Sequence, residues 1–438
     1  MVLLFLSSLA VAYSAYCNGS PDPNAKSNPY PVYAAAPTLL RSVKNGHAYL
    51  AGPPLSPFYV THVYGSGYEM GFAQGALYPA ELVSMVNRTW DYMLAQVESN
   101  LPFLPPALAK DISEFGLELA LDGLIDLTKP FTGAYFYEEL QGLADGAGLE
   151  YKKLARVHLI GELTQGDCSL IGAWKSATLG GKTLQLRALD WDTDGPFRDF
   201  PAVTVYHPTT PQAHPFANVG LLGFIGTFTG QSSAQLGVSE IGVSYPDPQH
   251  FPPPSGESFV GTPFVYLLRD VLEFDNSVED SVARMEDTNR TCNLILAVGD
   301  GKSQAARGFA YSATELFVYN DTNLQPYNNT PDTWHPRFTD VIYWVSLHRR
   351  KAGERVASQP PPFPTISPPL PTPRTHPPTH ANRAWTGCAQ ATAGLWQHRL
   401  LPTTGRSPPS SWPLRLLPAC RQGMCMQQCT TSLSSSSW

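Results

Sequence analysis

The apolar residues that follow Pro79 recur at helical spacing. A helix is predicted there because one set of apolar side chains returns every three or four positions, namely Leu82, Met85, Val86, Trp90, Met93, Leu94 and Val97. Further helices are predicted over about 107–127, 135–146 and 151–164, and a short strand at 58–64 precedes them all. Residues 58–167 are therefore predicted to be mostly helical.

The pattern changes at Cys168, where short runs with β-type character replace the helical period. These runs are bounded by Gly, Pro and Asp, and they predict strands at 168–177, 181–189, 202–206, 217–225, 238–244, 292–298, 305–311 and 315–320. Two helices are predicted among them, near 263–274 and 277–286. A helical part followed by a strand-rich part indicates an α+β fold of packed layers rather than a parallel βαβ series.

The N-terminus has the character of a secretory signal peptide. Residues 1–16 are a short apolar run that ends in small residues, without the length or flanks of a membrane span, although the usual basic start is missing. Residues 17–57 follow as an extended lead-in rich in Pro, Asn and Ser. Five N-x-S/T sequons support the secretory route, at Asn18, Asn87, Asn289, Asn320 and Asn328. We therefore expect a secreted or lysosomal glycoprotein without an integral membrane span.

Residues 345–438 differ from the rest of the chain in charge and composition. They hold ten of the 29 Lys and Arg residues and only one of the 36 acids, so the remainder carries a net charge of −16. Ten prolines fall between Pro360 and Pro378, and no helical or strand period follows, so this basic segment is predicted to be disordered.

Two interpretations of this tail remain open. It is either a genuine Pro-rich linker or, in the hypothesis that we favour, a translated intron, because Trp344-Val345-Ser346 is what a splice donor would encode. In the second case the strand-rich region 168–344 lacks its C-terminal part. Sequencing the transcript across Trp344 distinguishes the two, since a spliced message identical to this sequence would rule out the intron.

Composition and motifs exclude several classes of function. The formal net charge of −7 argues against a nucleic-acid partner. The sequence contains no P-loop and no Gly-x-Ser-x-Gly elbow, and Cys420, Cys425 and Cys429 lack the spacing of a zinc site. Neither a metal nor a cofactor is expected. His158 falls in an apolar helical run and is predicted to be packed or solvated rather than catalytic.

The stretch 166–192 brings a thiol close to a group of charged residues. Cys168 opens an apolar segment, a Gly-Gly turn reverses the chain, and the returning segment ends on Arg187 and Asp190. Because the thiolate is the reactive form of cysteine and a nearby cation stabilises it, this hairpin suits a nucleophile. The alternatives are a buried structural cysteine beside a surface salt bridge, or a disulfide between Cys168 and Cys292.

This hairpin resembles that of the N-terminal nucleophile (Ntn) hydrolases that use cysteine. The similarity rests on Cys168-Ser169, then Gly180-Gly181-Lys182, then Arg187-Ala188-Leu189-Asp190-Trp191. It is greatest to the acid ceramidase-like proteins, the N-acylethanolamine acid amidases and the related penicillin acyltransferases. Weaker similarity extends from about Tyr59 to Trp344, through 68–75, 138–146, 229–233 and 289–293. The resemblance implies a four-layer αββα sandwich.

The resemblance also implies a precursor that its own cysteine cuts between Asp167 and Cys168. The α-chain would then be about 17–167, and Cys168 would begin the β-chain that stays paired with it. The new α-amino group would serve as general base, since such an amine titrates at about pH 7–8. Arg187 would support the thiolate or a carboxyl or carbonyl group of the substrate, and Asp190 would hold the α-amino group. Because residues three apart on a strand point to opposite faces, Asp190 must then lie in the bend after the strand.

The oxyanion donors are less well defined. The family often carries Asn after a Thr-Gly-x sequence, whereas Ser232 occupies that position here, and Gln231 beside it could donate its amide instead. Asn293 is the better match to a family asparagine. Ala188 is a second departure, because relatives often carry Asn between the Arg and the Asp.

The reaction that the resemblance implies is hydrolysis of a linear amide. A lipid amide such as a ceramide or an N-acylethanolamine is the first candidate substrate. An acyltransferase or phospholipase B-like hydrolase on the same scaffold is the alternative among enzymes. A non-catalytic, truncated product is the alternative of a different class.

Overall fold

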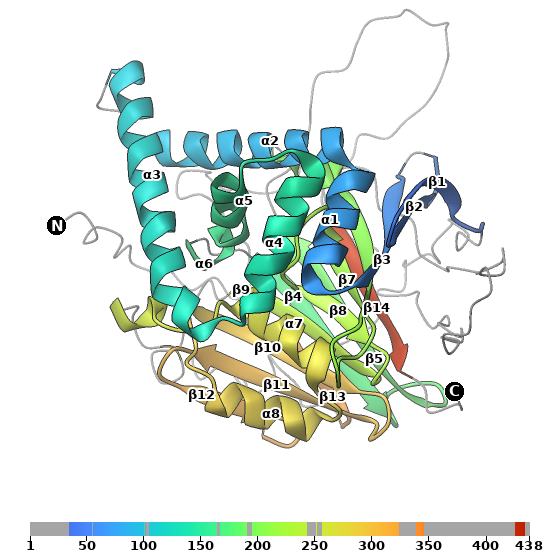
Figure 1. The fold of residues 1–438 in the computed structure, drawn as a ribbon. Coiled ribbons are helices and arrows are strands. Elements are labelled where there is room, and N and C mark those ends of the chain that lie inside the picture. The colour runs from blue at the N-terminus through green and yellow to red at the C-terminus, as the bar shows by residue number, and fades with distance from the viewer. Residues whose placement is uncertain are drawn as a thin grey trace, which may run out of the picture.

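A computed structural model describes residues 35–54, 56–99, 101, 105–163, 167–190, 195–242, 251, 256–323, 339–345 and 425–433. They form a mixed α/β structure with eight α-helices and two sheets (Figure 1). The proposed signal peptide, Asn18 and Asn328 lie outside the described residues. The predicted α+β class is confirmed at this level.

The larger sheet has ten strands in the order β1-β2-β3-β6-β7-β8-β9-β10-β11-β12. The strands are β1 (Thr38–Val43), β2 (Gly46–Ala51), β3 (Phe58–Gly65), β6 (Pro201–Pro208), β7 (Phe216–Leu221), β8 (Thr229–Ser232), β9 (Leu236–Gly242), β10 (Asn293–Asp300), β11 (Ala305–Ser312) and β12 (Leu316–Tyr319). Only the β3–β6 pair is parallel, because the helices and the hairpin of the second sheet are inserted between these two strands.

The smaller sheet has four strands in the order β13-β4-β5-β14. They are β13 (Val341–Val345), β4 (Asp167–Lys175), β5 (Gly181–Asp190) and β14 (Cys425–Leu433). Leu170 and Trp174 of this sheet pack with Ile241 and Ala297 of the larger one in a shared apolar cluster. The two sheets therefore face each other across a core, and the predicted thiol hairpin forms the centre of one of them.

The helices cover the other face of the larger sheet. They are α1 (Gly67–Leu77), α2 (Pro79–Glu98), α3 (Pro106–Thr128), α4 (Ala134–Ala147), α5 (Tyr151–His158), α6 (Ile160–Leu163), α7 (Phe264–Phe274) and α8 (Val278–Asp287). A single large cluster of buried apolar side chains joins them to this sheet. Helices, larger sheet and smaller sheet make three layers, and the fourth layer of the expected sandwich does not occur among the described residues. No helix within those ranges is long and apolar enough to cross a bilayer.

Three parts of the predicted organisation need correction. The lead-in 17–57, predicted only as extended, contains paired strands, because 38–51 form the β1–β2 hairpin at the edge of the larger sheet. The single helix expected over 151–164 is divided at Leu159 into α5 and α6. The tail is not wholly without structure, because residues 425–433 form β14 against β5. The N–H and C=O groups at the edge of β5 can pair with any extended segment free of Pro and Gly. Strand β14 therefore needs no alternation of apolar and polar residues of its own.

Glycines let helices α1 and α4 approach closely enough for their backbones to touch. Gly71 and Gly75 of α1 face α4, and Gly142 and Gly146 of α4 face α1. A Cβ added at Gly71 would overlap the carbonyl oxygen of Glu139, and one at Gly142 would overlap the carbonyl oxygen of Tyr68. The four-residue spacing places these glycines on one face of each helix, where any side chain would force the helices apart.

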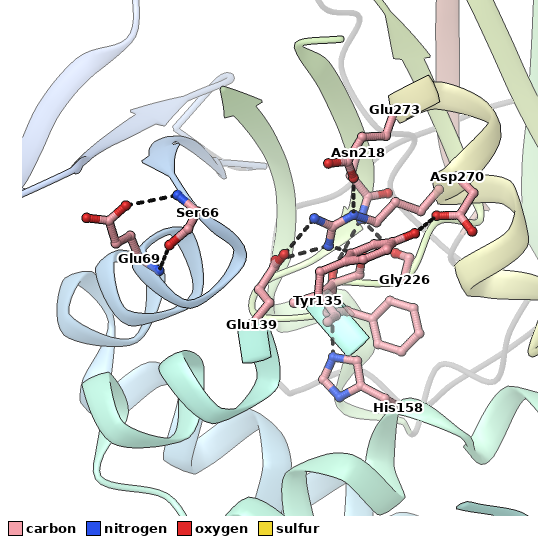
Figure 2. Close-up of polar contacts among 12 residues, drawn as sticks. Ser66, Glu69, Tyr135, Glu139, His158, Asn218, Gly226, Asp270 and Glu273 are labelled. Carbon is pink, nitrogen blue, oxygen red and sulfur yellow. Dashed lines mark hydrogen bonds and ion pairs between the residues drawn. The ribbon is translucent and has the colours of Figure 1, made fainter. Parts of the chain in front are cut away.

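A buried ion pair fixes α4 and α7 near the loop 222–228 (Figure 2). Arg269 is almost fully buried and holds the carboxylate of Glu139 through two hydrogen bonds of 3.0 and 2.5 Å. It also donates to the carbonyl oxygen of Ile225 at 3.1 Å, while the Asn218 amide donates to that of Gly226 at 2.7 Å. Arg269 must stay in place because Glu139 would otherwise be a buried carboxylate without a partner. Through its hydrogen bond to Ile225, Arg269 also holds the loop 222–228 in one conformation.

His158 holds the same loop from the other side. Its Nδ1 lies 2.9 Å from the Leu154 carbonyl oxygen and its Nε2 lies 3.1 Å from the amide nitrogen of Ile225. These partners require a neutral ring that donates from Nδ1 and accepts at Nε2. His158 is completely buried and stacks on Phe224. Of the two predicted environments for this histidine, packed or solvated, the structure shows the packed one.

This geometry predicts loss of stability in acid. Burial lowers the pKa of His158 from its usual 6.5 to about 4, so the unfolded chain takes up the proton first. The contribution is complete above pH 6.5, and it falls as the pH drops towards 4, by about 3 kcal/mol in all. His62 and His207, whose pKa values are also lowered to about 4 by burial, add to the same slope. Denaturant unfolding at pH 4.5 to 7.5 should show the combined slope, and His158→Phe should make it shallower by the His158 contribution. An equal slope in both proteins would contradict the assignment.

Candidate active site

The thiol of Cys168 and the guanidinium of Arg187 meet between the two sheets. In the β4–β5 ladder Cys168 is opposite Leu189 and Arg187 is opposite Leu170, so the two residues are diagonal neighbours on one face of the hairpin. Arg187 Nη2 lies 3.5 Å from Cys168 Sγ. Both side chains are buried, with exposed fractions of 2% for the cysteine and 1% for the arginine. The predicted neighbourhood of thiol and cation is therefore present.

Glu240 completes this group on the larger sheet. Arg187 donates from Nε to the carbonyl oxygen of Glu240 at 2.8 Å and from Nη2 to its carboxylate at 3.0 Å. Strand β8 begins its pairing with β9 at Thr229. The guanidinium of Arg187 lies over the ring of Phe228, the residue just before this strand. Burial raises the pKa of Glu240, and the charge of Arg187 opposes that shift.

Glu240 was not among the residues predicted from the sequence. Its signal was a lone acid in the otherwise uncharged run Leu236-Gly237-Val238-Ser239-Glu240-Ile241-Gly242. A carboxyl group buried in a strand must either be protonated or lie beside a cation. The sequence pattern did not show that Arg187 of the β4–β5 hairpin would be that cation.

The second described cysteine has the opposite electrostatic environment. Cys292 Sγ lies 2.6 Å from the carboxyl oxygen Oε2 of Glu162, whose Oε1 accepts from the amide nitrogen of Phe264 at 2.9 Å. Burial raises the pKa of the Cys292 thiol well above its usual value, and Glu162 raises it further. Cys168 and Cys292 are not joined to each other, so the disulfide considered between them is not formed. Of the two thiols, only Cys168 lies beside a cation.

Asp190 occupies a position that its expected role did not allow for. It is the last residue of β5 and pairs with Asp167 in the ladder, so it belongs to the strand and does not lie in a following bend. The backbone condition for Asp190 and Arg187 to share a face is therefore not met. The side chains of Asp167 and Asp190 lie outside the described part of the structure.

The three oxyanion candidates are placed differently. Ser232 pairs with Phe216, whose ring belongs to the core between the larger sheet and the helices, so Ser232 points away from the hairpin. Gln231 is on the opposite face of β8, together with Thr229 and towards the smaller sheet. Asn293 begins β10 opposite Ser312, directly after Cys292, which has a left-handed φ of 57°. Gln231 and Asn293 stay candidates, and Ser232 fits the role poorly.

Three predicted sequons fall within the described residues. Asn87 on α2 and Asn289 after α8 are exposed, while Asn320 after β12 is half-buried and accepts hydrogen bonds from Thr322 and Asn323 through its side chain. The modification of these residues stays a prediction.

Comparison with known proteins places the chain in a family. No family model matches the sequence. The chain is similar to protein dcd1A of Dictyostelium discoideum, with 35% identity over 353 residues, which cover 78% of each chain. The chain belongs to the dcd1 family. A second member, dcd1B of the same organism, is 33% identical over 330 residues, which cover 74% of this chain and 64% of dcd1B.

Two solved structures are more distantly similar to this dcd1-family chain. One is a Caenorhabditis elegans N-acylethanolamine-hydrolyzing acid amidase, with 18% identity, a TM-score of 0.29, and coverage of 42% of this chain and 71% of the amidase. The other is penicillin V acylase from Agrobacterium tumefaciens, with 16% identity, a TM-score of 0.22, and coverage of 35% and 49%. Both TM-scores are too low to establish a common fold.

Proposed function

We propose that this protein is a self-cleaving amidohydrolase of the Ntn type whose nucleophile is Cys168. The observation that carries the proposal is the buried group of Cys168, Arg187 and Glu240, in which a cation lies against one thiol. The other described thiol, that of Cys292, lies against a carboxyl group. The sequence resemblance at 168–191 supports the same assignment.

Self-cleavage would begin at the peptide bond between Asp167 and Cys168. The Cys168 sulfur attacks the carbonyl carbon of Asp167, its thiol proton passes to the departing nitrogen, and a thioester replaces the peptide bond. Water then hydrolyses the thioester, which leaves Asp167 with a carboxylate and frees the sulfur. Cys168 gains an α-amino group that did not exist before the cut.

Turnover would repeat this chemistry on an external amide. The α-amino group takes the thiol proton, and the thiolate attacks the substrate carbonyl carbon. The amine product leaves with the proton that the α-ammonium returns, and water hydrolyses the acyl-thioester. Arg187 Nη1 is buried and has no hydrogen-bond partner among the described residues, so it can donate to a substrate oxygen as negative charge develops there.

The substrate class follows from the resemblance rather than from the geometry. A lipid amide, such as a ceramide or an N-acylethanolamine, is the first candidate, with the lysosome or the extracellular space as the place of action. Transfer of the acyl group to an acceptor other than water, or a phospholipase B-like hydrolysis, would use the same thiol. An acyltransferase would differ in the acceptor that takes the acyl group from the thioester. A phospholipase B-like hydrolase would differ in the group that leaves when the thioester forms.

Thiol alkylation combined with an amide-hydrolysis assay tests this proposal. We expect iodoacetamide to abolish release of fatty acid from N-acyl amides in proportion to labelling of Cys168, as located by peptide mass spectrometry. Cys292 should label far more slowly because the adjacent carboxyl group of Glu162 raises the pKa of its thiol, whereas Cys168 lies beside Arg187. The Cys292→Ser variant should be inactivated at the wild-type rate. Full activity in protein labelled at Cys168 would refute the assignment.

A further inference from the structure

Two histidines meet across the parallel strand pair β3–β6 of the larger sheet. His62 on β3 has Val205 of β6 as its Cα partner, and His207 follows two positions later, so the two histidines are diagonal neighbours on one face. His62 Nδ1 lies 3.1 Å from His207 Nε2, and the ring centroids are 5.4 Å apart with an interplanar angle of 18°. The two nitrogens therefore face each other as donor and acceptor of one hydrogen bond.

Neighbouring aromatic rings keep both imidazoles in this arrangement. The ring of Tyr64 stacks on that of His207, with centroids 4.3 Å apart and an interplanar angle of 8°. Tyr49 of β2 meets the ring of His62 edge-on, with centroids 6.0 Å apart. Both histidines are half-buried, so their rings are held by packing as well as by the hydrogen bond.

The surroundings of the pair offer nothing to balance a positive charge. His47 is opposite His62 on β2, and its Nδ1 lies 3.0 Å from Ser42 Oγ. The other neighbours on this face of β2, β3, β6 and β7 are apolar or aromatic, namely Tyr49, Val60, Val203, Val205, Ala217 and Val219. No Asp, Glu, Lys or Arg within the described ranges contributes to the pKa of either ring. A charge placed here is therefore poorly stabilised by the described residues.

The contact between the two rings admits only one proton between the facing nitrogens. One nitrogen must donate and the other must accept, so a second proton there leaves no acceptor and sets two imidazolium charges against each other. We propose that the contact of His62 with His207 is a proton-operated joint between β3 and β6, which is closed at neutral pH and opens in acid. Burial lowers the pKa of both rings, and His207 and His47 lower that of His62 further, so the opened strands bind protons that the closed ones exclude.

The joint lies where the two proposed chains share a sheet. Strand β3 precedes Cys168 and β6 follows it, so in the cleaved enzyme that we propose this pair links the α-chain to the β-chain. Strands β1, β2 and β3 form one edge of the larger sheet and pair with the rest of it only through β6 (Figure 1). Acid would therefore loosen this edge. The opening itself needs no cut, so the joint and the self-cleavage can be tested separately.

Amide hydrogen exchange of the full chain, followed by mass spectrometry, tests the proposal. After correction for the intrinsic pH dependence of exchange, we expect the opening equilibrium of β2 and β3 to rise by about tenfold or more per pH unit from pH 6 to 4.5, relative to that of β10. Exchange in β10 serves as the reference because it reports opening of the centre of the sheet, including any effect of His158. The Cys168→Ala protein should show the same rise, because the joint does not depend on cleavage.

The double variant His62→Phe/His207→Phe is the matched control. Phenylalanine keeps an aromatic ring beside Tyr64 and takes up no proton, so the rise in exchange should disappear while β2 and β3 stay protected at pH 7. A rise that persists in the double variant would assign it to another group, such as His47, and would overturn the proposal. Equal pH dependence of β3 and β10 in the wild-type protein would also overturn it.

A titration of the wild-type protein gives the same test without any substitution. With ¹³C-labelled histidine, the ring signals of His62 and His207 should report protonation over the same pH range in which β3 loses its amide protection. Protonation of both rings while β3 stays fully protected would show that the closed contact accepts the second proton, and the joint would be ruled out.

Discussion

Replacing Cys168 by Ala is expected to leave the purified chain uncut and to reduce amide hydrolysis to the background level. The substitution removes the sulfur atom that we propose as the nucleophile of both reactions, while alanine occupies the same place in the apolar cluster between the sheets. The loss should exceed about a thousand-fold, since removal of a covalent nucleophile leaves only binding and charge stabilisation. Gel mobility reports cleavage, and release of fatty acid from an N-acyl amide reports turnover.

The matched control is Cys292→Ala. The Cys292 thiol is hydrogen-bonded to Glu162 and takes no part in the contact between Cys168 and Arg187. Cleavage and hydrolysis should therefore both continue in this variant. A Cys168→Ala protein that is still cut at the same bond would show that another group cleaves it. Hydrolysis that survives in Cys168→Ala but disappears in Cys292→Ala would reverse the assignment of the two thiols.

Replacing Gly71 by Ala is expected to destabilise the fold by about 3 kcal/mol or more, or to prevent folding. The added methyl group would overlap the carbonyl oxygen of Glu139, and a backbone atom cannot move aside as a flexible side chain can. Separating α1 from α4 would also disturb the contact of Glu139 with buried Arg269. Urea unfolding followed by circular dichroism measures the effect.

Gly220→Ala provides a comparison of the same chemical size. Gly220 lies in β7, and a Cβ there would meet nothing within 4 Å. Its free energy of unfolding should stay within about 0.5 kcal/mol of the wild type, as is usual for substitutions away from strained or crowded positions. Equal stability of Gly71→Ala and Gly220→Ala would mean that α1 and α4 do not touch through their backbones.

The sequence predicted the elements with a strong period of their own. Helix α2 was predicted because Leu82, Met85 and Trp90 make an apolar stripe, and all three are buried. The β4–β5 hairpin was predicted because a Gly-Gly turn joins two β-type runs, and both glycines of that turn have positive φ. These elements carry the information for their formation locally.

Elements that depend on a distant partner were missed. Strand β8 has only four residues and exists because β7 and β9 lie on either side of it. Helix α1 was not predicted as an element of its own, and its glycines form the contact with α4. Strand β14 forms against β5, far away in the sequence. Local pattern cannot show what a segment will meet.

The candidate site divides in the same way. Cys168 and Arg187 belong to one hairpin, so their neighbourhood followed from the turn between them. Glu240 comes from the other sheet, and its contact with Arg187 depends on how the two sheets pack. Ser232 and Gln231 are adjacent on β8 and point to opposite faces, so which of the two faces the hairpin depends on the pairing of β8 with its neighbours.

The most direct test of the account is the N-terminal sequence of the chains in the purified mature protein. The account predicts two chains after denaturation, and it predicts that the second begins Cys-Ser-Leu-Ile-Gly-Ala-Trp, at Cys168. An intact chain that nonetheless hydrolyses amides would contradict it, because no α-amino group would then exist at Cys168. A second chain that begins at any other residue would contradict it equally.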